Sequence, residues 1–111
     1  MKVITPPPLH VTRSLNRLGQ AVSMARRRRR LTQQDLAERI GASANTVRRM
    51  EAGFPGTALV HVARALQVFG ELDKLDQLLE TPQDTIGLTL MDEQLPQRVR
   101  KPRKTPESGA F

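Results

Sequence analysis

A polar helix face between residues 43 and 53 carries the side chains best suited to chemistry in this sequence. At 100° per residue, Val47 and Met50 point to one side of a helix over this range, and Asn45 points almost opposite. In the major groove of DNA an Asn amide can pair with adenine, an Arg guanidinium with guanine, and a methyl group can touch the thymine methyl. A solvated surface shows the same residue types, so the neighbouring elements must decide between the two interpretations. The predicted base-contacting residues are Ala44, Asn45, Arg48 and Arg49.

A second short helix comes directly before this one and must position it. Thr32 and Asp35 have the spacing of a capping box that starts a helix, and Gly41 stands where a left-handed residue ends it. Only two residues later, Ser43 can cap the next helix. Two short helices joined this closely cannot be collinear, so they must cross steeply as a helix-turn-helix. Gln33 and the backbone N–H groups beside it are placed to hold a DNA phosphate.

The positive charge of the chain is concentrated in the segment that contains both helices. The formal net charge is +7 over 111 residues. Residues 10–70 carry eleven Lys or Arg against three acidic residues, residues 71–97 carry one Lys against seven acidic residues, and residues 98–111 carry five Lys or Arg against one Glu. The first segment should therefore face a polyanion, and the acidic one should face away from it or toward another partner. In the run 26–30, helical spacing allows one or two phosphate contacts, not five.

Several classes of function lack the residues that they need. The chain has no Cys, and His10 and His61 are too few for a His-rich metal site or a Ser-His-Asp triad. We therefore expect no enzyme activity, no metal and no cofactor. No apolar run approaches the roughly 20 residues of a membrane span, and the first ten residues lack the apolar core of a signal peptide. We expect a cytoplasmic protein that associates with the nucleoid when it is bound to DNA.

Apolar spacing predicts an all-α fold of five helices followed by one short strand. The helices are expected over about residues 12–29, 32–41, 43–53, 57–69 and 71–80. Thr12 and Thr57 are the predicted N-caps of the first and fourth helices. In the fourth helix the residues expected to face inward are Leu59, Val62, Leu66 and Phe69.

Four segments follow from this pattern. Alternation over 86–90 predicts a short dimerising strand. Pro- and Lys/Arg-rich composition predicts disorder at both ends. The segments are a disordered arm (1–11), a DNA-binding domain (12–80), a strand or turn segment for dimer or partner contacts (81–95) and a basic, Pro-rich disordered tail (96–111). Because the ordered core is small, a dimer partner should help to stabilise it.

The stretch ARRRRRLTQQDLAERIGASANTVRRMEAG resembles the phage-repressor-type helix-turn-helix family, also called XRE-like, and the resemblance covers about residues 14–80. It implies five helices and binding of operator DNA as a symmetric dimer. By position, Gln33 resembles the phosphate-clamping residue, Ala44, Asn45 and Arg49 fall on base-reading positions, and Arg26 and Glu51 match a structural ion pair. The phosphate contacts expected on this basis come from Gln33, Thr32, Ser43, Thr46 and Arg26.

Three further segments are similar to the antitoxins encoded beside HipA-type kinase toxins, the HipB-like proteins. They are the loop 51–56, the segment ARALQVFGELDKLDQLL and the later LPQRVRK. The resemblance implies the autoregulating antitoxin of a type II toxin-antitoxin operon, with a HipA-like kinase as partner. The alternative is a stand-alone XRE-family regulator with no toxin partner. A kinase-like reading frame next to the gene would favour the antitoxin, and a solitary gene would favour the regulator.

Overall fold

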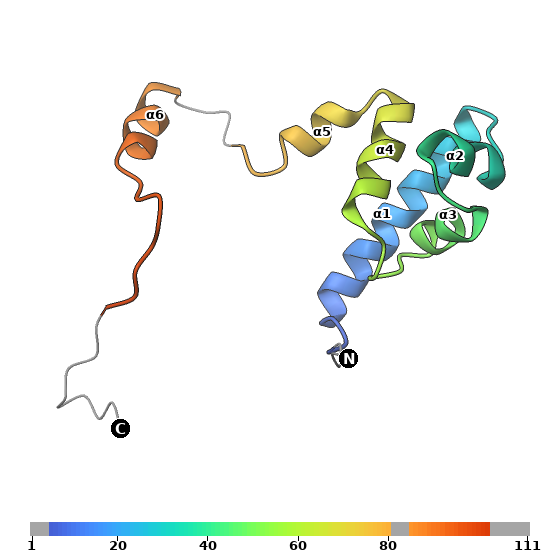
Figure 1. Cartoon of the computed structure of the whole chain (residues 1–111), viewed down its shortest axis with the longest axis horizontal. Coiled ribbons are helices and arrows are strands. Elements are labelled where there is room, and N and C mark those ends of the chain that lie inside the picture. The colour runs from blue at the N-terminus through green and yellow to red at the C-terminus, as the bar shows by residue number, and fades with distance from the viewer. Residues whose placement is uncertain (1–4, 81–84, 103–111) are drawn as a thin grey trace. The chain divides into compact units, whose positions relative to one another are not determined.

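The computed structural model describes residues 5–80 and 85–102, and these residues contain six α-helices (Figure 1). Helices α1 to α5 belong to one compact unit that ends at Leu79, and α6 belongs to a second unit that begins at Glu80. The all-α prediction is confirmed, with six helices in the described residues rather than five. The bounds are α1 Leu9–Arg28, α2 Gln33–Ile40, α3 Ala44–Glu51, α4 Leu59–Phe69, α5 Leu72–Asp76 and α6 Thr85–Glu93.

Helix α1 begins three residues earlier than the sequence predicts. Its N-cap is Pro8, whose carbonyl accepts the Thr12 N–H at 3.0 Å, and no side chain caps this end. The proline ring holds φ at −57° and its carbonyl opens the first turn, so the chain is helical before it reaches Thr12. The prediction of Thr12 as N-cap is therefore wrong, and residues 9–11, which the sequence assigned to the disordered arm, are helical.

The caps predicted around α2 and α3 are confirmed. The Asp35 N–H donates to the Thr32 hydroxyl and the Thr32 N–H donates to the Asp35 carboxylate, each at 2.9 Å. Hydrogen bonding of the Asp35 carboxylate by the backbone N–H of Thr32, and then by its side chain, holds the pKa of Asp35 below its usual value. Gly41 ends α2 at φ 70°, and the Ser43 hydroxyl then accepts the Thr46 N–H at the start of α3. The left-handed residue between the two caps turns the chain, so that α2 and α3 pack against each other.

The core lies where α2 and α3 meet α1 and α4. Leu36, Ile40 and Val47 are its largest fully buried side chains. In the described residues the buried hydrophobic set is Val22, Leu36, Ala37, Ile40, Val47, Met50, Ala65 and Phe69. Gly19 lets α1 approach the end of α3, because a Cβ there would lie 2.7 Å from the carbonyl carbon of Glu51. The backbones of α1 and α3 are therefore in direct contact at this point.

The start of α4 differs from the prediction. The helix begins at Leu59 after Ala58, with no side-chain cap. Thr57, the predicted cap, instead donates its N–H to the Phe54 carbonyl at 3.2 Å, so it belongs to the preceding turn and its hydroxyl is buried without a partner in the described residues. The Leu59 side chain, expected inside, is 67% exposed, because it lies in the first turn, beyond the packed part of the helix. Gly70 ends α4 in the left-handed conformation.

The strand predicted over residues 86–90 is wrong, because these residues lie in helix α6. Alternation over only five positions does not separate a strand from a helix, since residues 86 and 90 also share one helix face. Helix α5 is also shorter than predicted and ends at Asp76, and the turn that follows exposes Leu78 and Leu79.

Replacing Gly19 by alanine should destabilise the fold even though alanine is the better helix former. The added methyl group meets the backbone of Glu51, which cannot move aside without shifting α3. We expect the free energy of unfolding in urea to fall by about 1–3 kcal/mol. Gln20→Ala, at the adjacent exposed position, is the control and should change it by no more than about 0.5 kcal/mol. Equal effects of the two substitutions would contradict the close approach of α1 and α3.

Candidate nucleic-acid interface

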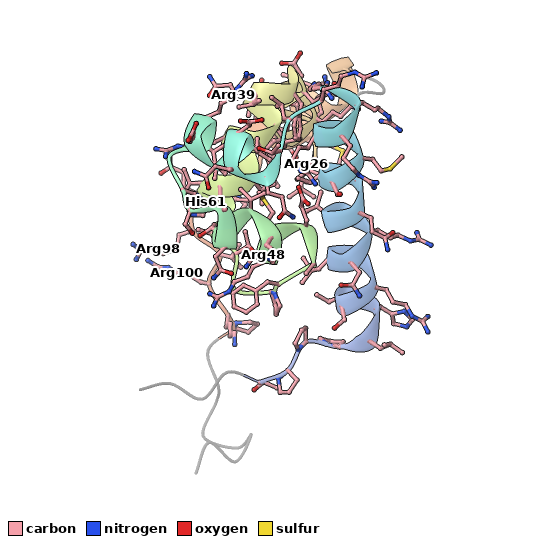
Figure 2. All side chains as sticks on the ribbon, turned by 90° about the vertical axis from the view of Figure 1, so that its right-hand side faces the viewer. Arg26, Arg39, Arg48, His61, Arg98 and Arg100 are labelled. Atoms are coloured by element: carbon pink, nitrogen blue, oxygen red, sulfur yellow. The ribbon has the colours of Figure 1, made fainter. Side chains whose placement is uncertain are left out.

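The α3 face that the sequence assigns to base contacts is accessible. Asn45, Arg48 and Arg49 are exposed and Ala44 is half-buried, whereas the opposite side of the helix belongs to the core. Arg48 extends from α3 (Figure 2), and its guanidinium donates to Oδ1 of Asn45. Bidentate pairing with adenine uses the same oxygen as an acceptor. The two side chains must therefore share or rearrange this bond when they meet a base, and they form one unit rather than two independent contacts.

Arg49 makes a contact that sequence reasoning missed. Its guanidinium carbon lies 5.5 Å from the centroid of the Phe54 ring, within the range of a cation–π interaction. Phe54 follows α3 directly and is 44% exposed. The signal in the sequence was an aromatic residue next to the polar helix in a chain with only three Phe and no Tyr or Trp.

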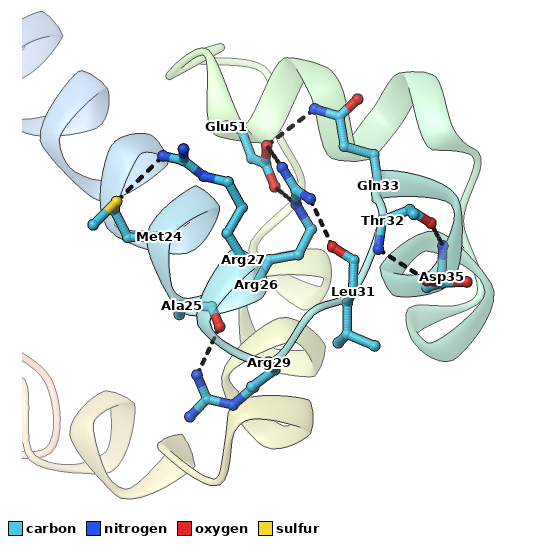
Figure 3. Close-up of polar contacts among 10 residues, drawn as sticks. All are labelled: Met24, Ala25, Arg26, Arg27, Arg29, Leu31, Thr32, Gln33, Asp35 and Glu51. Carbon is cyan, nitrogen blue, oxygen red and sulfur yellow. Dashed lines mark hydrogen bonds and ion pairs between the residues drawn. The ribbon is translucent and has the colours of Figure 1, made fainter.

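The structure brings Arg26 and Glu51 together (Figure 3). Arg26 Nε donates to Oε2 of Glu51 at 2.6 Å and Nη2 donates to Oε1 at 3.1 Å, while Nη1 donates to the Leu31 carbonyl at 2.7 Å. The two charged side chains are only 11% and 7% exposed. Arg26 thus ties the end of α1 to the last residue of α3 and to the chain that enters α2. Two N–H groups and little exposed surface remain for the phosphate contact expected of it.

Gln33 is held by the same carboxylate. Its Nε2 donates to Oε1 of Glu51 at 3.0 Å (Figure 3). Glu51 therefore orients both Arg26 and Gln33, which is a role that the sequence did not assign to it. The bond joins residues 18 positions apart, so no local pattern could have revealed it. One N–H of the Gln33 amide stays available for a phosphate oxygen.

The three hydroxyl groups expected to contact phosphates make hydrogen bonds within the protein at the starts of α2 and α3. The Thr32 hydroxyl accepts from Asp35, the Ser43 hydroxyl accepts from the Thr46 N–H at 3.1 Å, and the Ser43 and Thr46 hydroxyls lie 3.0 Å apart. Thr32 and Ser43 are nevertheless exposed. They sit at the starts of α2 and α3, where unpaired backbone N–H groups and the positive end of the helix dipole favour an anion.

The five consecutive arginines have separate roles. Besides Arg26, Arg29 is structural: it donates to the carbonyls of Ala25 and Phe69, both at 2.8 Å, and lies 4.9 Å from the centroid of the Phe69 ring. Arg28 and Arg30 are exposed and make no side-chain hydrogen bond within the part of the chain that the structure describes. The run therefore holds α1 against α3 and α4 through Arg26 and Arg29, and it leaves Arg28 and Arg30 for solvent or phosphates.

The first unit contains an apolar groove that reaches the loop after α3. It has a volume of about 530 Å³ and is formed by α1, the loop after α3, α4 and α5. Its lining includes Leu15, Leu18, Val62, Leu66, Leu75 and Leu78. In the second unit, Leu90, Met91 and Leu95 are each more than half exposed. Apolar surface of this kind is typical of a protein interface.

The described residues contain no group of His, Cys, Asp and Glu that could hold a metal ion. None of the helices in those residues is long and apolar enough to cross a membrane.

Two capped helices joined by a left-handed glycine, the second with a buried side and an exposed polar side, define a helix-turn-helix unit. A family model described as a helix-turn-helix domain matches residues 17–86, which is more than half of the chain. The protein belongs to this family, and it is a DNA-binding helix-turn-helix protein. No curated protein and no solved structure gives a significant match to the chain.

Removing one partner of the Arg26–Glu51 pair should cost far more than removing both. Arg26→Met leaves the largely buried carboxylate without its cation, and we expect the free energy of unfolding in urea to fall by about 2–4 kcal/mol. The double variant with Arg26→Met and Glu51→Met should recover part of this loss. Lys74→Met, in the exposed pair with Glu71, is the control and should change stability by less than about 1 kcal/mol. Equal losses from Arg26→Met and Lys74→Met would contradict the bridging role.

Proposed function

We propose that this protein is a sequence-specific transcriptional repressor that binds double-stranded operator DNA as a homodimer. The observation that carries the proposal is the exposed face of Asn45, Arg48 and Arg49 on a helix whose other side is buried. The last residue of that helix, Glu51, is tied to α1. A rigidly held helix that presents amide and guanidinium groups suits the reading of base edges in the major groove. Membership in the helix-turn-helix family supports the same conclusion.

In the proposed complex, α3 enters the major groove and its polar face contacts the bases. Gln33 donates to a phosphate with the N–H that Glu51 leaves unused, and the exposed helix starts at Thr32 and Ser43 contact the backbone nearby. Thr46 lies beside Ser43 at the start of α3 and contributes to the same backbone contact. Two copies place two α3 helices in successive major grooves about 34–36 Å apart. Bound there, the dimer represses transcription by blocking access to the promoter. Phosphate neutralisation makes the affinity dependent on salt.

The homodimer needs a surface away from α3, and the apolar groove between α1, α4 and α5 supports one. Its lining carries Arg28 and Lys74 together with Glu71, so both charge signs needed for pairing between two identical surfaces are present. Burial of the groove would also extend the small core of the first unit.

Arg49→Ala and Gln33→Ala should both weaken DNA binding, but they should differ in how the loss depends on the DNA sequence. Gel shifts would use the DNA upstream of the gene and a panel of single base-pair changes in the bound site. Loss of Arg49 should cost about 1–3 kcal/mol, concentrated at one base pair per half-site, because a base contact is lost. Loss of Gln33 should weaken binding to all sequences equally, because a phosphate contact is lost.

Gln34→Ala is the matched control, since Gln34 is exposed and bonds only to Glu38 within α2 among the described residues. It should leave binding within about twofold of the unchanged protein, in line with a surface substitution. A uniform loss from Arg49→Ala, or a base-specific loss from Gln33→Ala, would reverse the assigned roles. Absence of any sequence preference in the unchanged protein would overturn the proposed function itself.

A finer proposal is that the regulator is an autoregulating antitoxin with a HipA-like kinase as partner. It is favoured by apolar surface outside the groove, namely the exposed Leu90, Met91 and Leu95 of the second unit. Expression of the protein together with the product of the adjacent reading frame tests it. Co-purification with a kinase-like neighbour, and a changed gel shift on addition of that neighbour, are the expected results. A solitary gene, or a neighbour that does not bind, would leave the stand-alone regulator.

A further inference from the structure

Phe54 lies in an unusual position for one of the few aromatic residues of this chain. The chain has three Phe and no Tyr or Trp. Phe69 is buried in the core, whereas Phe54 is 44% exposed in the loop that follows the polar helix. An aromatic ring placed at the surface beside a candidate DNA-reading helix calls for an explanation other than core packing.

The loop fixes the backbone of Phe54 on both sides. Its N–H donates to the carbonyl of Arg49 at 2.9 Å, and its carbonyl accepts the Thr57 N–H at 3.2 Å. Gly53, immediately before it, has φ 80°, a left-handed conformation that an L side chain rarely adopts. The chain therefore turns back on the end of α3 and brings residue 54 beside residue 49.

The ring of Phe54 is fixed as well. It lies directly over Gly56, where a Cβ would come within 2.6 Å of the Phe54 Cε2 atom. Any side chain at position 56 would thus displace the ring. The Arg49 guanidinium lies over the same ring, with its central carbon 5.5 Å from the ring centroid. The Phe54 ring thus lies between Gly56 of the loop and Arg49 of α3.

A guanidinium held over an aromatic ring by a cation–π contact keeps its N–H groups for other partners, because that contact uses no hydrogen bond. Those N–H groups are the ones that pair with O6 and N7 of guanine. Stacking also restricts the rotation of a long, flexible side chain, which otherwise loses conformational entropy when it binds. Arg48 differs from Arg49 in this respect, because one of its N–H groups already donates a hydrogen bond to Asn45.

We infer that Phe54 is a positioning residue that holds the Arg49 guanidinium in the orientation needed to read one base pair. The inference rests on the proposed DNA-binding function and assigns part of its sequence specificity to the loop 53–56. Phe54 also lines the apolar groove, so a test must separate the positioning of Arg49 from packing.

Phe54→Leu removes the π face and keeps an apolar side chain, while Phe54→Tyr keeps the ring. Each is measured against the bound site and its single base-pair variants, with thermal unfolding as a check on folding. We expect Phe54→Leu to weaken binding about 5–10-fold, with the loss confined to the base pair that Arg49→Ala also affects. Phe54→Tyr should bind within about twofold of the unchanged protein. Adding Phe54→Leu to Arg49→Ala should produce no further base-specific loss.

Gly56→Ala provides a second variant that leaves Phe54 in place but displaces its ring, and it should give the same base-specific loss. Phe69→Leu is the matched control, because this ring also carries an arginine but lies in the core. It should lower stability without any base-specific effect. A uniform loss from Phe54→Leu on all DNA sequences, or additive losses in the double variant, would overturn the inference while the repressor function stands. Lack of sequence preference in the unchanged protein would overturn both.

Discussion

The carboxylate of Glu51 is the group on which the candidate interface depends. It closes α3, receives two hydrogen bonds from Arg26 and one from Gln33, and thereby joins α1, α2 and α3 at one largely buried point. A buried ion pair of this kind contributes little net stability, because desolvation of the charges offsets their attraction. Its contribution is geometric: it allows one arrangement of the three helices and penalises the others. The backbone contact at Gly19 imposes the same arrangement through sterics.

The uneven charge of the chain acquires a structural meaning once the arginines are placed. Arg26 neutralises a carboxylate within the fold, so it adds little to the external field, whereas the exposed Arg29 donates to uncharged carbonyls and keeps its charge. The exposed arginines of α1 and α3 carry that field instead. The Arg26–Glu51 pair cancels within the net charge of residues 10–70, so the charge that DNA would meet comes from the other guanidinium groups, and their positions matter more than their number.

Features determined within a few residues were predictable from the sequence, and features determined by tertiary contacts were not. The caps at Thr32, Gly41 and Ser43 depend on neighbours at most five positions away, and the sequence placed them correctly. Thr57 has a side chain suited to capping a helix, but its backbone N–H bonds to the Phe54 carbonyl in the preceding turn. No local sequence rule separates these two outcomes. The alternation over residues 86–90 was too short to exclude a helix.

The candidate site shows the same division. Helical periodicity placed the polar face of α3 opposite the core. The sharing of Glu51 between Arg26 and Gln33, and the stacking of Arg49 on Phe54, required the packed structure. The family resemblance pointed to the ion pair, and periodicity alone did not. The sequence pattern does not show which side chains restrain one another, because this depends on contacts between different helices and loops.

The residues that hold α3 in place are not the residues of its polar face. The polar face can therefore change in evolution without a change in the fold. The contacts that hold the helix use its buried side and Glu51, whereas the side chains of Asn45 and Arg48 bond only to each other within the described residues. Duplicated copies could exchange these two residues and acquire new operators without loss of the fold. Arg49 is less free to change, because its partner Phe54 would lose the cation stacked on it. Evolution of new target sites should therefore begin at positions 45 and 48.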